Sequence, residues 1–568
     1  MEAKYQGRLE LTWTNKHKRL LAQPDGTYEW VTPADYRVAE IRLLQPAETH
    51  DDNPNDNLLI QGDSLYALQS LKDMPPYQNI YEGKIKLAYI DPPFNTQQAF
   101  EQYDDALEHS VWLTMMRDRL AQIRTLLCDA GTVWVHCDDS EQHRLRCVMD
   151  EVFGPDNFYA TFIWRKVDSP NDNHVAVTTD HDYLICYAKS RRDIRFNPKP
   201  DESILQAYGS STEDGRRYRD RLLKKNGRNS LREDRPTMFF PVQDPDGNAI
   251  YPIHEDGREA CWSKGLTEVL RLSEVGELIW KRRIIAGQEQ WVPYTREWAP
   301  PTPVRPWPTI WTDAHTMRQA KAHLTALFPG MTVFATPKPE LLLYRILSVA
   351  SNPGDIVLDC FAGSGTTAAV AHKMGRRWVV VEWSQDTVEK FIVPRLQKVI
   401  AGEDTGGITE SVSWEGGGGF RVMAVAPSMF ADVGGRIVLA DWATNGQLSQ
   451  AVAAQLGFEY QTDPPFCGKK GNQRLAVVDG MVNKDVVALV VQQLTPEERL
   501  ILCGTAVSSD ARTALRKLCP GSSIRKIPSA LVSGYKYRPP AYESDAMAPD
   551  TPLSKSDKPS KGEASDHA

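Results

Sequence analysis

Short, continuous runs of apolar residues recur along the first third of the chain, at 58–60, 87–90 and 132–137. Such runs are typical of strands that are buried on both faces of a sheet. Between them, residues 110–127 carry apolar side chains at the three- and four-residue spacing of an amphipathic helix. Helices and strands that alternate in this way predict a parallel, doubly wound α/β sheet.

The alternation stops at Lys189 and resumes near Thr336. The stretch from Lys189 to Arg235 holds 14 lysines and arginines against 8 aspartates and glutamates, and tryptophans are frequent after it. A basic excess of this size in a chain of net charge −8 favours an inserted segment that faces DNA. The alternative is a small accessory domain with a charged rim.

The sheet pattern continues with a helix at 342–350 and strands that end at Asp359 and Glu382. After the glycine run 416–419, the C-terminal part is expected to be a small α/β domain. Its expected elements are strands at 475–478, 486–491 and 500–503 and a helix at 509–518. Near the other end of the chain, residues 9–13 are expected to form a strand.

These changes of pattern divide the chain into seven expected parts. They are an N-terminal arm (1–56, ending in a polar linker at 48–57), the first half of the sheet domain (57–188), an inserted domain (189–333), the second half of the sheet domain (334–402), a glycine-rich linker (403–419), a C-terminal α/β domain (420–541) and a disordered tail (542–568).

Composition narrows the class of protein further. The chain has 568 residues, which is too long for one hydrophobic core. Its nine cysteines show no paired CxxC spacing, so we expect reduced thiols and no metal site. The first residues lack the apolar core of a signal peptide, and no apolar run reaches membrane-spanning length. We therefore expect a cytoplasmic protein without a membrane partner.

The first candidate site is the sequence Asp91-Pro92-Pro93-Phe94. It follows an apolar run directly, so Asp91 is expected at the carboxyl end of a strand, where open α/β sheets place their ligand chemistry. The two prolines remove backbone donors and restrict φ, so we expect nearby carbonyl oxygens to stay free and fixed in direction. A carboxylate and a carbonyl that face one point suit an exocyclic amine, and Phe94 offers a flat face on which a base lifted out of a duplex can stack.

Two further positions leave alternatives open. The sequence Asp463-Pro464-Pro465-Phe466 repeats the first motif, but no apolar strand leads into it, so we interpret it as a surface turn. Asp63 follows the strand at 58–60 and precedes a helix. It can accept a hydrogen bond from a bound ligand or cap the helix, and the sequence does not separate these two roles.

A glycine-rich turn follows the strand that ends at Asp359. Gly363 and Gly365 permit a tight turn with close approach of the backbone to a ligand, and the next helix begins at Thr366. The free amides of that helix terminus suit a carboxylate or a phosphate. A dinucleotide is the alternative ligand, although Ala368 stands where the dinucleotide fingerprint has its third glycine.

The order of these motifs resembles the beta class of DNA amino-methyltransferases, in which the catalytic motif precedes the cofactor motif and the target-recognition region lies between them. The resemblance covers roughly residues 9–400, and the N-terminal segment and the C-terminal extension are most similar to the modification (Mod) subunits of type III restriction-modification systems. It implies a Rossmann-like methyltransferase sheet and the cofactor S-adenosyl-L-methionine (AdoMet).

The resemblance also implies residue roles. The catalytic motif would be Asp91, Pro92, Pro93 and Phe94. The residues that bind AdoMet would be Asp63 at the adenine, Glu382 at the ribose, Lys338 and Pro339 at the methionine end, and Asp359, Phe361, Gly363, Gly365 and Thr366 around the loop. Phe94 stands where tyrosine is commoner, and Cys360 where proline is frequent.

The implied function is site-specific methylation of the N6 amine of a flipped adenine in double-stranded DNA. Implied partners are a second copy of the chain and a restriction subunit with helicase and nuclease activity. Alternatives are methylation of cytosine N4, of RNA or of a protein amide, and a DNA-specificity subunit without catalysis. An Asp before Pro-Pro resembles the adenine enzymes, and a Pro-Cys nucleophile of the cytosine-C5 kind is not the motif here.

Overall fold

The structure is a computed structural model. It describes residues 9–23, 27–50, 57–95, 108–168, 176–285 and 288–535. The expected disordered tail at 542–568 lies outside these residues.

A ten-stranded sheet forms the centre of the larger of two units, which holds residues 1–197 and 308–568. In spatial order its strands are β17 (Ile310–Trp311), β7 (Phe158–Arg165), β8 (His181–Ala188), β6 (Leu127–Cys137), β5 (Ile85–Ile90), β18 (Ile356–Asp359), β19 (Arg377–Glu382), β4 (Leu58–Gln61), β20 (Phe420–Val425) and β3 (Leu44–His50). The six strands from β6 to β20 are parallel, whereas β8 and β3 run antiparallel to their neighbours. The expected α/β sheet is confirmed, with antiparallel strands near its edges.

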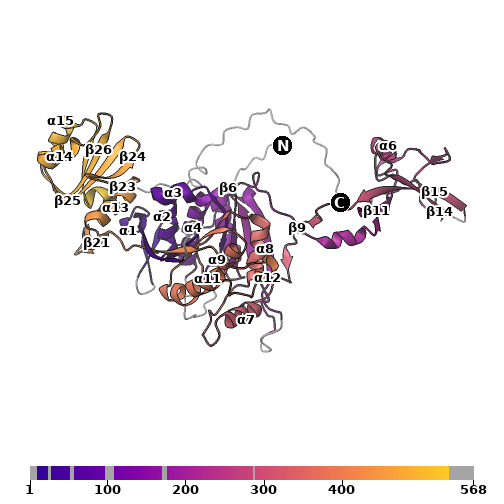
Figure 1. The fold of residues 1–568 in the computed structure, drawn as a ribbon, viewed down its shortest axis with the longest axis horizontal. Coiled ribbons are helices and arrows are strands. Elements are labelled where there is room, and N and C mark those ends of the chain that lie inside the picture. Colours follow the sequence, from indigo (N-terminus) through magenta and orange to yellow (C-terminus); the bar gives the residue numbers. More distant parts are fainter. Residues whose placement is uncertain are drawn as a thin grey trace. The chain divides into compact units, whose positions relative to one another are not determined.

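Helices pack on this sheet in two groups (Figure 1). The first group shares one hydrophobic core with β5 and β6, to which Ile90 and Val135 contribute. It consists of α2 (Ser64–Asp73), α4 (His109–Leu126) and α5 (Gln142–Phe153). The second group packs near β5, β18 and β19 and consists of α8 (Glu340–Ala350), α9 (Thr366–Lys373) and α11 (Val393–Ile400). Shorter elements complete this part: β1 (Arg19–Ala22), β2 (Tyr28–Val31), α1 (Tyr36–Ala39), α3 (Pro75–Tyr81), α7 (Met317–Leu327), α10 (Gln385–Thr387) and α12 (Thr409–Val412).

The second unit holds residues 198–307, within the stretch where the sequence pattern breaks. Its sheet has the order β10 (Ser210–Ser211), β11 (Arg217–Leu222), β15 (Gln288–Trp298) and β14 (Leu278–Ile285). Its other elements are β9 (Lys199–Pro200), β12 (Val242–Gln243), β13 (Ala249–Ile250), β16 (Val304–Arg305) and α6 (Leu266–Glu274). A small core of its own, with Leu223, Val242, Trp262 and Val269, supports this unit.

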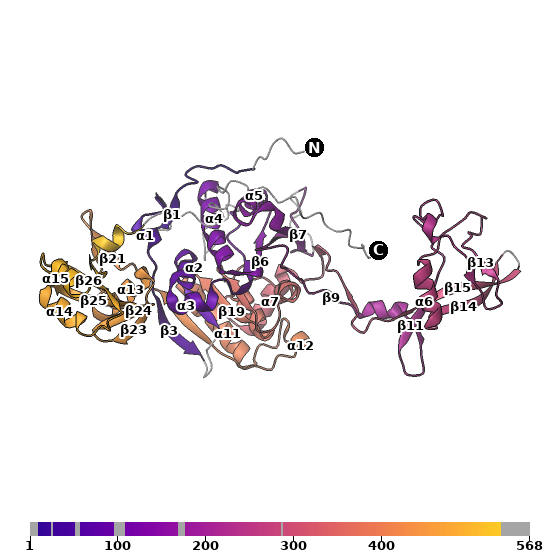
Figure 2. The same cartoon turned by 90° about the horizontal axis from the view of Figure 1, so that it is seen from above.

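The C-terminal part adds β20 to the central sheet. It then forms a five-stranded sheet of its own, most strands of which are labelled in Figure 2. In order, these strands are β23 (Glu459–Asp463), β24 (Phe466–Lys470), β25 (Gln473–Val482), β26 (Arg499–Val507) and β27 (Ser523–Lys526). The other elements are β21 (Phe430–Val433), β22 (Arg436–Leu439), α13 (Asn445–Leu456), α14 (Lys484–Val491), α15 (Ala511–Leu518) and α16 (Ser529–Val532).

Three expectations for local structure were wrong. Residues 486–491 belong to α14, because Asn483 caps a helix there and the apolar run alone does not separate a helix from a strand. Residues 9–13 form no strand; side chains hold them instead, through bonds from the Leu11 amide to Glu151 and from Trp13 to Thr114. Residues 48–50, expected in a linker, are part of β3.

No helix in the described ranges has both the length and the apolar composition needed to cross a membrane.

Candidate active site at the carboxyl edge of the central sheet

The carboxyl ends of four neighbouring parallel strands bring the candidate residues to one edge of the sheet. Asp91 follows β5, Asp359 ends β18, Glu382 ends β19, and Asp63 follows β4 by two residues. Neighbouring parallel strands end at the same edge of a sheet, so four acidic side chains that are far apart in sequence lie along this edge.

The Asp91 carboxylate has one outward and one inward oxygen. Its Oδ2 accepts a hydrogen bond of 2.6 Å from Lys338 Nζ. Its Oδ1 is buried and has no hydrogen-bond partner among the described residues, while the side chain as a whole is 20% exposed. A buried oxygen without a donor is costly, so the carboxylate is a poor structural element and a good candidate for ligand chemistry.

Lys338 links the Asp91 motif to the glycine-rich loop. Its ammonium lies 5.1 Å from the centre of the Phe94 ring, and its backbone oxygen accepts a 3.2 Å hydrogen bond from Thr366 Oγ1. The two segments that the sequence separates by about 270 residues therefore share one lysine. Pro339 N-caps α8 directly after it.

The proline carbonyls are not all available. The Pro93 oxygen accepts a hydrogen bond of 2.6 Å from the Trp112 indole, so it is engaged within the fold. Our expectation that the carbonyls of this motif stay free is wrong for Pro93. Pro92 is buried and Phe94 is partly exposed.

The loop between β18 and α9 has the conformation that its glycines predict. Gly363 and Gly365 have φ values of +50° and +74°, a region that residues with a Cβ rarely occupy. The Gly363 amide donates to Glu382 Oε2 over 2.9 Å, and the Phe361 amide donates to Asp359 Oδ1 over 2.9 Å. A Cβ on Gly365 would lie 3.0 Å from the Ile392 side chain, so the close packing of the loop also requires glycine there.

Burial dominates the electrostatics of the acids beside this loop. It raises the pKa of Asp359 to about 7, against the hydrogen bonds from Thr367 Oγ1 and the Phe361 amide and with the help of the nearby charges of Asp91 and Glu382. Burial also raises the pKa of Glu382, which accepts hydrogen bonds from the amides of Ser384 and Gly363.

Asp63 shows the capping role that the sequence left open. Its Oδ1 accepts from the Leu65 amide over 2.8 Å and from Arg119 Nη2 over 2.6 Å. The same residue also lines a cavity of about 1300 Å³. The wall of the cavity consists largely of residues at the end of β4, after β19 and at the end of β20, among them Gln61, Gly62, Trp383, Ser384, Phe391 and Val425.

The cavity is large enough for the nucleoside half of AdoMet. Its volume exceeds that of typical small-molecule pockets, and its wall joins aromatic rings to the Asp63 carboxylate. Gly363 and Gly365, which the resemblance places in the loop around AdoMet, and Glu382, which it places at the ribose, are not part of this wall. The described residues could therefore hold the nucleoside in the cavity, with Lys338 and the loop beyond it.

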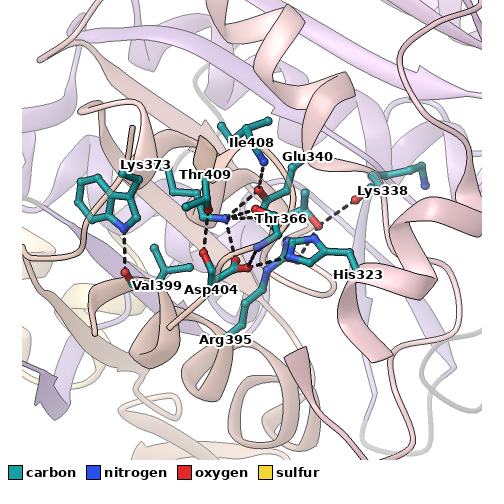
Figure 3. A network of polar contacts seen from close by, with 12 residues as sticks. His323, Lys338, Glu340, Thr366, Lys373, Arg395, Val399, Asp404, Ile408 and Thr409 are labelled. Atoms are coloured by element: carbon teal, nitrogen blue, oxygen red, sulfur yellow. Dashed lines mark hydrogen bonds and ion pairs between the residues drawn. The ribbon is translucent and has the colours of Figure 1, made fainter. Parts of the chain in front are cut away.

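A buried network of ion pairs and hydrogen bonds surrounds Thr366, where the loop ends and α9 begins (Figure 3). Lys373, whose side chain is fully buried, donates to Glu340 Oε2 over 2.9 Å and to Asp404 Oδ2 over 2.7 Å. Arg395 donates to Glu340 Oε1 over 2.9 Å and to Thr366 Oγ1 over 2.8 Å. Every acid in this cluster has a cationic partner, as a buried charge requires, so the network fixes α8, α9 and α11 around Thr366.

His323, Glu340 and Asp404 in this network lie close enough to hold a metal ion. The Lys373 ammonium bonds both carboxylates, however, and supplies the positive charge that an ion would bring. The cluster therefore has a structural explanation without a metal.

Sequence reasoning missed Arg119, His136 and Arg395. Arg119 bonds Asp63 and Ser64, and Arg395 bonds the loop. His136 is fully buried beside Asp91, with its Nδ1 3.9 Å from Asp91 Oδ1. A local signal exists only for His136, a polar residue inside the apolar run 132–137.

Comparison with known proteins identifies the family of the chain. A family model described as DNA methylase, of the N6/N4 type, matches residues 85–393, which is more than half of the chain. The chain belongs to this DNA methylase family. The match begins with β5 and ends at α11, so it contains both the Asp91 motif and the glycine-rich loop.

Relatives in the family come from several restriction-modification systems. The chain is 30% identical to the "Probable type III restriction-modification enzyme HindVI Mod subunit" of Haemophilus influenzae, over 66% of this chain and 55% of that protein. It is 29% identical to the type II methyltransferase M.KpnI of Klebsiella pneumoniae, over 59% of this chain and 80% of that protein. The chain thus spans little more than half the length of the Haemophilus relative.

Solved structures of DNA methyltransferases align with much of the chain. The cytosine-N4-specific PvuII DNA methyltransferase has 15% sequence identity and a TM-score of 0.32, over 66% of this chain and 94% of that chain. The M1.HpyAVI–SAM complex has 14% identity and a TM-score of 0.29, over 60% of this chain and 98% of that one.

Proposed function

We propose that this protein is an AdoMet-dependent DNA methyltransferase that methylates the N6 amine of an adenine flipped out of double-stranded DNA. The observation that carries the proposal is the Asp91 carboxylate at the sheet edge, partly exposed beside Phe94 and joined through Lys338 to the glycine-rich loop. Membership of the DNA methylase family supports the same activity.

AdoMet would supply an activated methyl group on a sulfonium. The cavity beside Asp63 would hold its nucleoside. Glu382, which directly precedes the wall residues Trp383 and Ser384, would approach the ribose, and the turn at Gly363 and Gly365 would approach the methionine end. Lys338 and the start of α9 at Thr366 offer positive charge for the methionine carboxylate.

The residues of the motif would then direct the amine. An adenine amine is a weak nucleophile because its lone pair is delocalised into the ring. Hydrogen bonds from the amine to Asp91 Oδ2 and to the Pro92 carbonyl favour a tetrahedral nitrogen whose lone pair points at the methyl group. Phe94 stacks on the base, and alignment of this kind lowers a barrier by about 7–11 kcal/mol in well-oriented cases.

In the structure Lys338 occupies Asp91 Oδ2, the oxygen that the amine needs. Its ammonium, against a carboxylate and over the Phe94 ring, therefore stands where we place the target amine. Binding of the base requires Lys338 to leave this position, and the methionine carboxylate is a natural acceptor for it.

The decisive test is the change Asp91→Ala. We expect it to abolish transfer of labelled methyl groups from AdoMet to duplex DNA and to leave DNA binding largely intact, because the carboxylate acts on the amine and not on the duplex. The matched control is Asp463→Ala in the second Asp-Pro-Pro-Phe sequence, whose carboxylate is exposed and pairs with Arg474. Normal methylation by the Asp91→Ala protein would refute the assignment.

The identity of the base is the finer part of the proposal. Cytosine N4 is the second candidate, because the same geometry serves another exocyclic amine and the family model covers both types. Asp91 before Pro-Pro supports adenine through the resemblance stated above. Modification-sensitive sequencing of DNA methylated by the protein identifies the base and the recognition sequence together.

Partners follow from the names of the relatives. Several are Mod subunits of type III restriction-modification enzymes, so we infer that this protein serves a restriction-modification system, as a homodimer with a restriction subunit. Light scattering of the protein alone tests whether it forms a homodimer. Co-purification with a helicase-nuclease chain tests whether it binds a restriction subunit.

A further inference from the structure

The inward side of Asp91 faces a second buried constellation, formed by His136 and Asp182. His136 lies on β6 and Asp182 on β8, the strand that pairs with β6 in antiparallel register. His136 Nε2 lies 3.2 Å from Asp182 Oδ2, and Lys166 Nζ donates to Asp182 Oδ1 over 2.7 Å. The His136 side chain is fully buried.

Because Asp182 is ionised, it determines which nitrogen of the His136 ring carries a hydrogen. Burial by itself raises the pKa of Asp182, but the hydrogen bond from His136 and the charges of His136 and Lys166 outweigh it and lower the pKa to about 2. An ionised carboxylate accepts hydrogen bonds only, so Nε2 of His136 carries the hydrogen and points it at Asp182.

The other ring nitrogen faces the active site. His136 Nδ1 lies 2.9 Å from the Tyr89 hydroxyl and 3.9 Å from Asp91 Oδ1. Burial, together with the charge of Asp91, holds the pKa of Tyr89 well above its usual range, so its hydroxyl stays protonated. Phe94 also packs on the imidazole, with ring centres 5.4 Å apart.

These contacts place Asp91 between two nitrogen groups. Lys338 holds the outward oxygen, and His136 is the polar group beside the inward oxygen, which has no hydrogen-bond partner among the described residues. When the target amine takes the place of Lys338, Asp91 loses its cationic partner. In the neutral ring Nδ1 accepts a hydrogen bond from the Tyr89 hydroxyl. In the protonated ring, which Asp182 stabilises, Nδ1 becomes a charged donor with two acceptors, the Tyr89 oxygen and Asp91 Oδ1, and it needs to approach by about 1 Å to bond Oδ1.

We propose that His136, held by Asp182, is the positioning residue of Asp91: in its protonated form it fixes the inward oxygen and keeps the outward oxygen directed at the target amine. This proposal rests on the proposed methyltransferase function and adds a pH-dependent element to it. The titratable groups around the ring are Tyr89 on β5, Asp91 directly after β5, Asp182 on β8, Lys166 after β7, and Lys338 and Asp359 across the Asp91 carboxylate.

The test measures single-turnover methyl transfer to duplex DNA as a function of pH, with AdoMet and DNA saturating. In the unmodified protein the rate should fall as the pH rises and the ring loses its proton. In His136→Gln the amide keeps a donor for Asp182 but has no titratable nitrogen. We expect its rate to be about a hundredfold lower and this fall to be absent, with AdoMet and DNA affinities unchanged.

A second variant tests the coupling between the two residues. Asp182→Asn removes the charge that stabilises the imidazolium, so the fall in rate should move to lower pH by about one unit or more. A merely structural role of Asp182 would lower the rate at every pH alike. The shift of the pH profile in Asp182→Asn therefore decides the proposal even if the His136→Gln protein fails to fold. Thermal unfolding shows whether the His136→Gln protein is folded.

The matched control is His372→Gln. His372 is also buried and bonded through both nitrogens, to Gly417 and to Asn57, and we assign it no role in the site. Its variant should keep the unmodified pH profile. Loss of methylation in the unmodified protein itself would refute the proposed function; a His136→Gln protein with the normal rate, or an Asp182→Asn protein with the normal profile, would refute this inference alone.

Discussion

At the scale of single residues, Asp182 and Asp359 show how charged partners can reverse the effect of burial on an acid. Asp182 and Asp359 are both 2% exposed. Asp182 has His136 and Lys166 as partners, and its pKa is about 2; Asp359 has neutral donors and anionic neighbours, and burial raises its pKa to about 7. The site thus holds one acid firmly ionised and another that is ready to take a proton near neutrality.

The raised pKa of Asp359 predicts how the stability of the protein depends on pH. The folded state binds this proton more tightly than the unfolded state, whose value is near 3.8. Its contribution to the free energy of unfolding is therefore full below pH 3.8 and is lost as the pH rises towards 7. The side chain of the Asp359→Asn protein is an uncharged amide that does not titrate, so its stability should not fall in this way between pH 3.8 and 7.

At pH 8 we expect the free energy of unfolding of Asp359→Asn to exceed that of the unmodified protein by roughly a few kcal/mol. At pH 4 we expect no such gain. Urea unfolding at the two pH values measures the difference. The control is Asp463→Asn, an exposed acid in the five-stranded sheet. An equal gain at both pH values would contradict the account.

At the scale of elements, the turn between β18 and α9 depends on two left-handed backbone positions. Gly363 donates its amide to Glu382 and places the start of α9 beside Lys338. A Cβ on Gly363 would lie 3.5 Å from the Phe334 ring, so space is sufficient and the cost of a side chain comes from the backbone. Such strain costs about 1–3 kcal/mol at each position.

The change Gly363→Val should weaken AdoMet binding by about tenfold or more, as titration calorimetry measures, because it distorts the loop and fills the approach to it. Gly354→Val is the matched control. Gly354 also has a positive φ, of +86°, but no atom lies within 4 Å of its added Cβ. It should lose similar stability and keep its AdoMet affinity. An unchanged affinity in Gly363→Val would refute the role of the loop.

At the scale of the whole molecule, the sheet that places the four acids and the inserted unit are separate bodies with separate cores. One face of the inserted sheet carries basic side chains over aromatic rings. Arg216 lies 3.9 Å from the centre of the Trp298 ring, and Arg283 lies 5.9 Å from that of Tyr294. Tyr294 and Trp298 are four positions apart on β15, and side chains an even number of positions apart on a strand point to the same face of the sheet. Basic and aromatic side chains on one face suit contact with phosphates and bases.

We predict that the double change Arg216→Ala, Arg283→Ala weakens DNA binding in a salt-dependent way. The slope of log affinity against log salt concentration should decrease in magnitude by about 2, because each arginine that neutralises a phosphate contributes about 1 to this magnitude. Arg271→Ala is the control, since Arg271 on α6 pairs with Glu268. An unchanged salt slope in the double variant would contradict an interaction between this face and DNA.

The sequence by itself determined what depends on neighbouring residues along the chain. Apolar runs marked the strands that end at Asp91, Asp359 and Glu382, and the glycines marked the turn with positive φ values. Local patterns record these features because burial and backbone freedom act on successive residues. The order of the motifs then indicated the family, which the family model confirms.

Only the tertiary structure decided which distant groups meet. The bond between Lys338 and Asp91 joins residues 247 positions apart, and His136 reaches Asp182 and Asp91 through three neighbouring strands. The run at 486–491 became a helix for a similar reason, because burial of Val487 and Val490 against the C-terminal core outweighs strand propensity. Pairing of charges and selection of a packed face depend on segments that the fold brings together, and no local pattern records them.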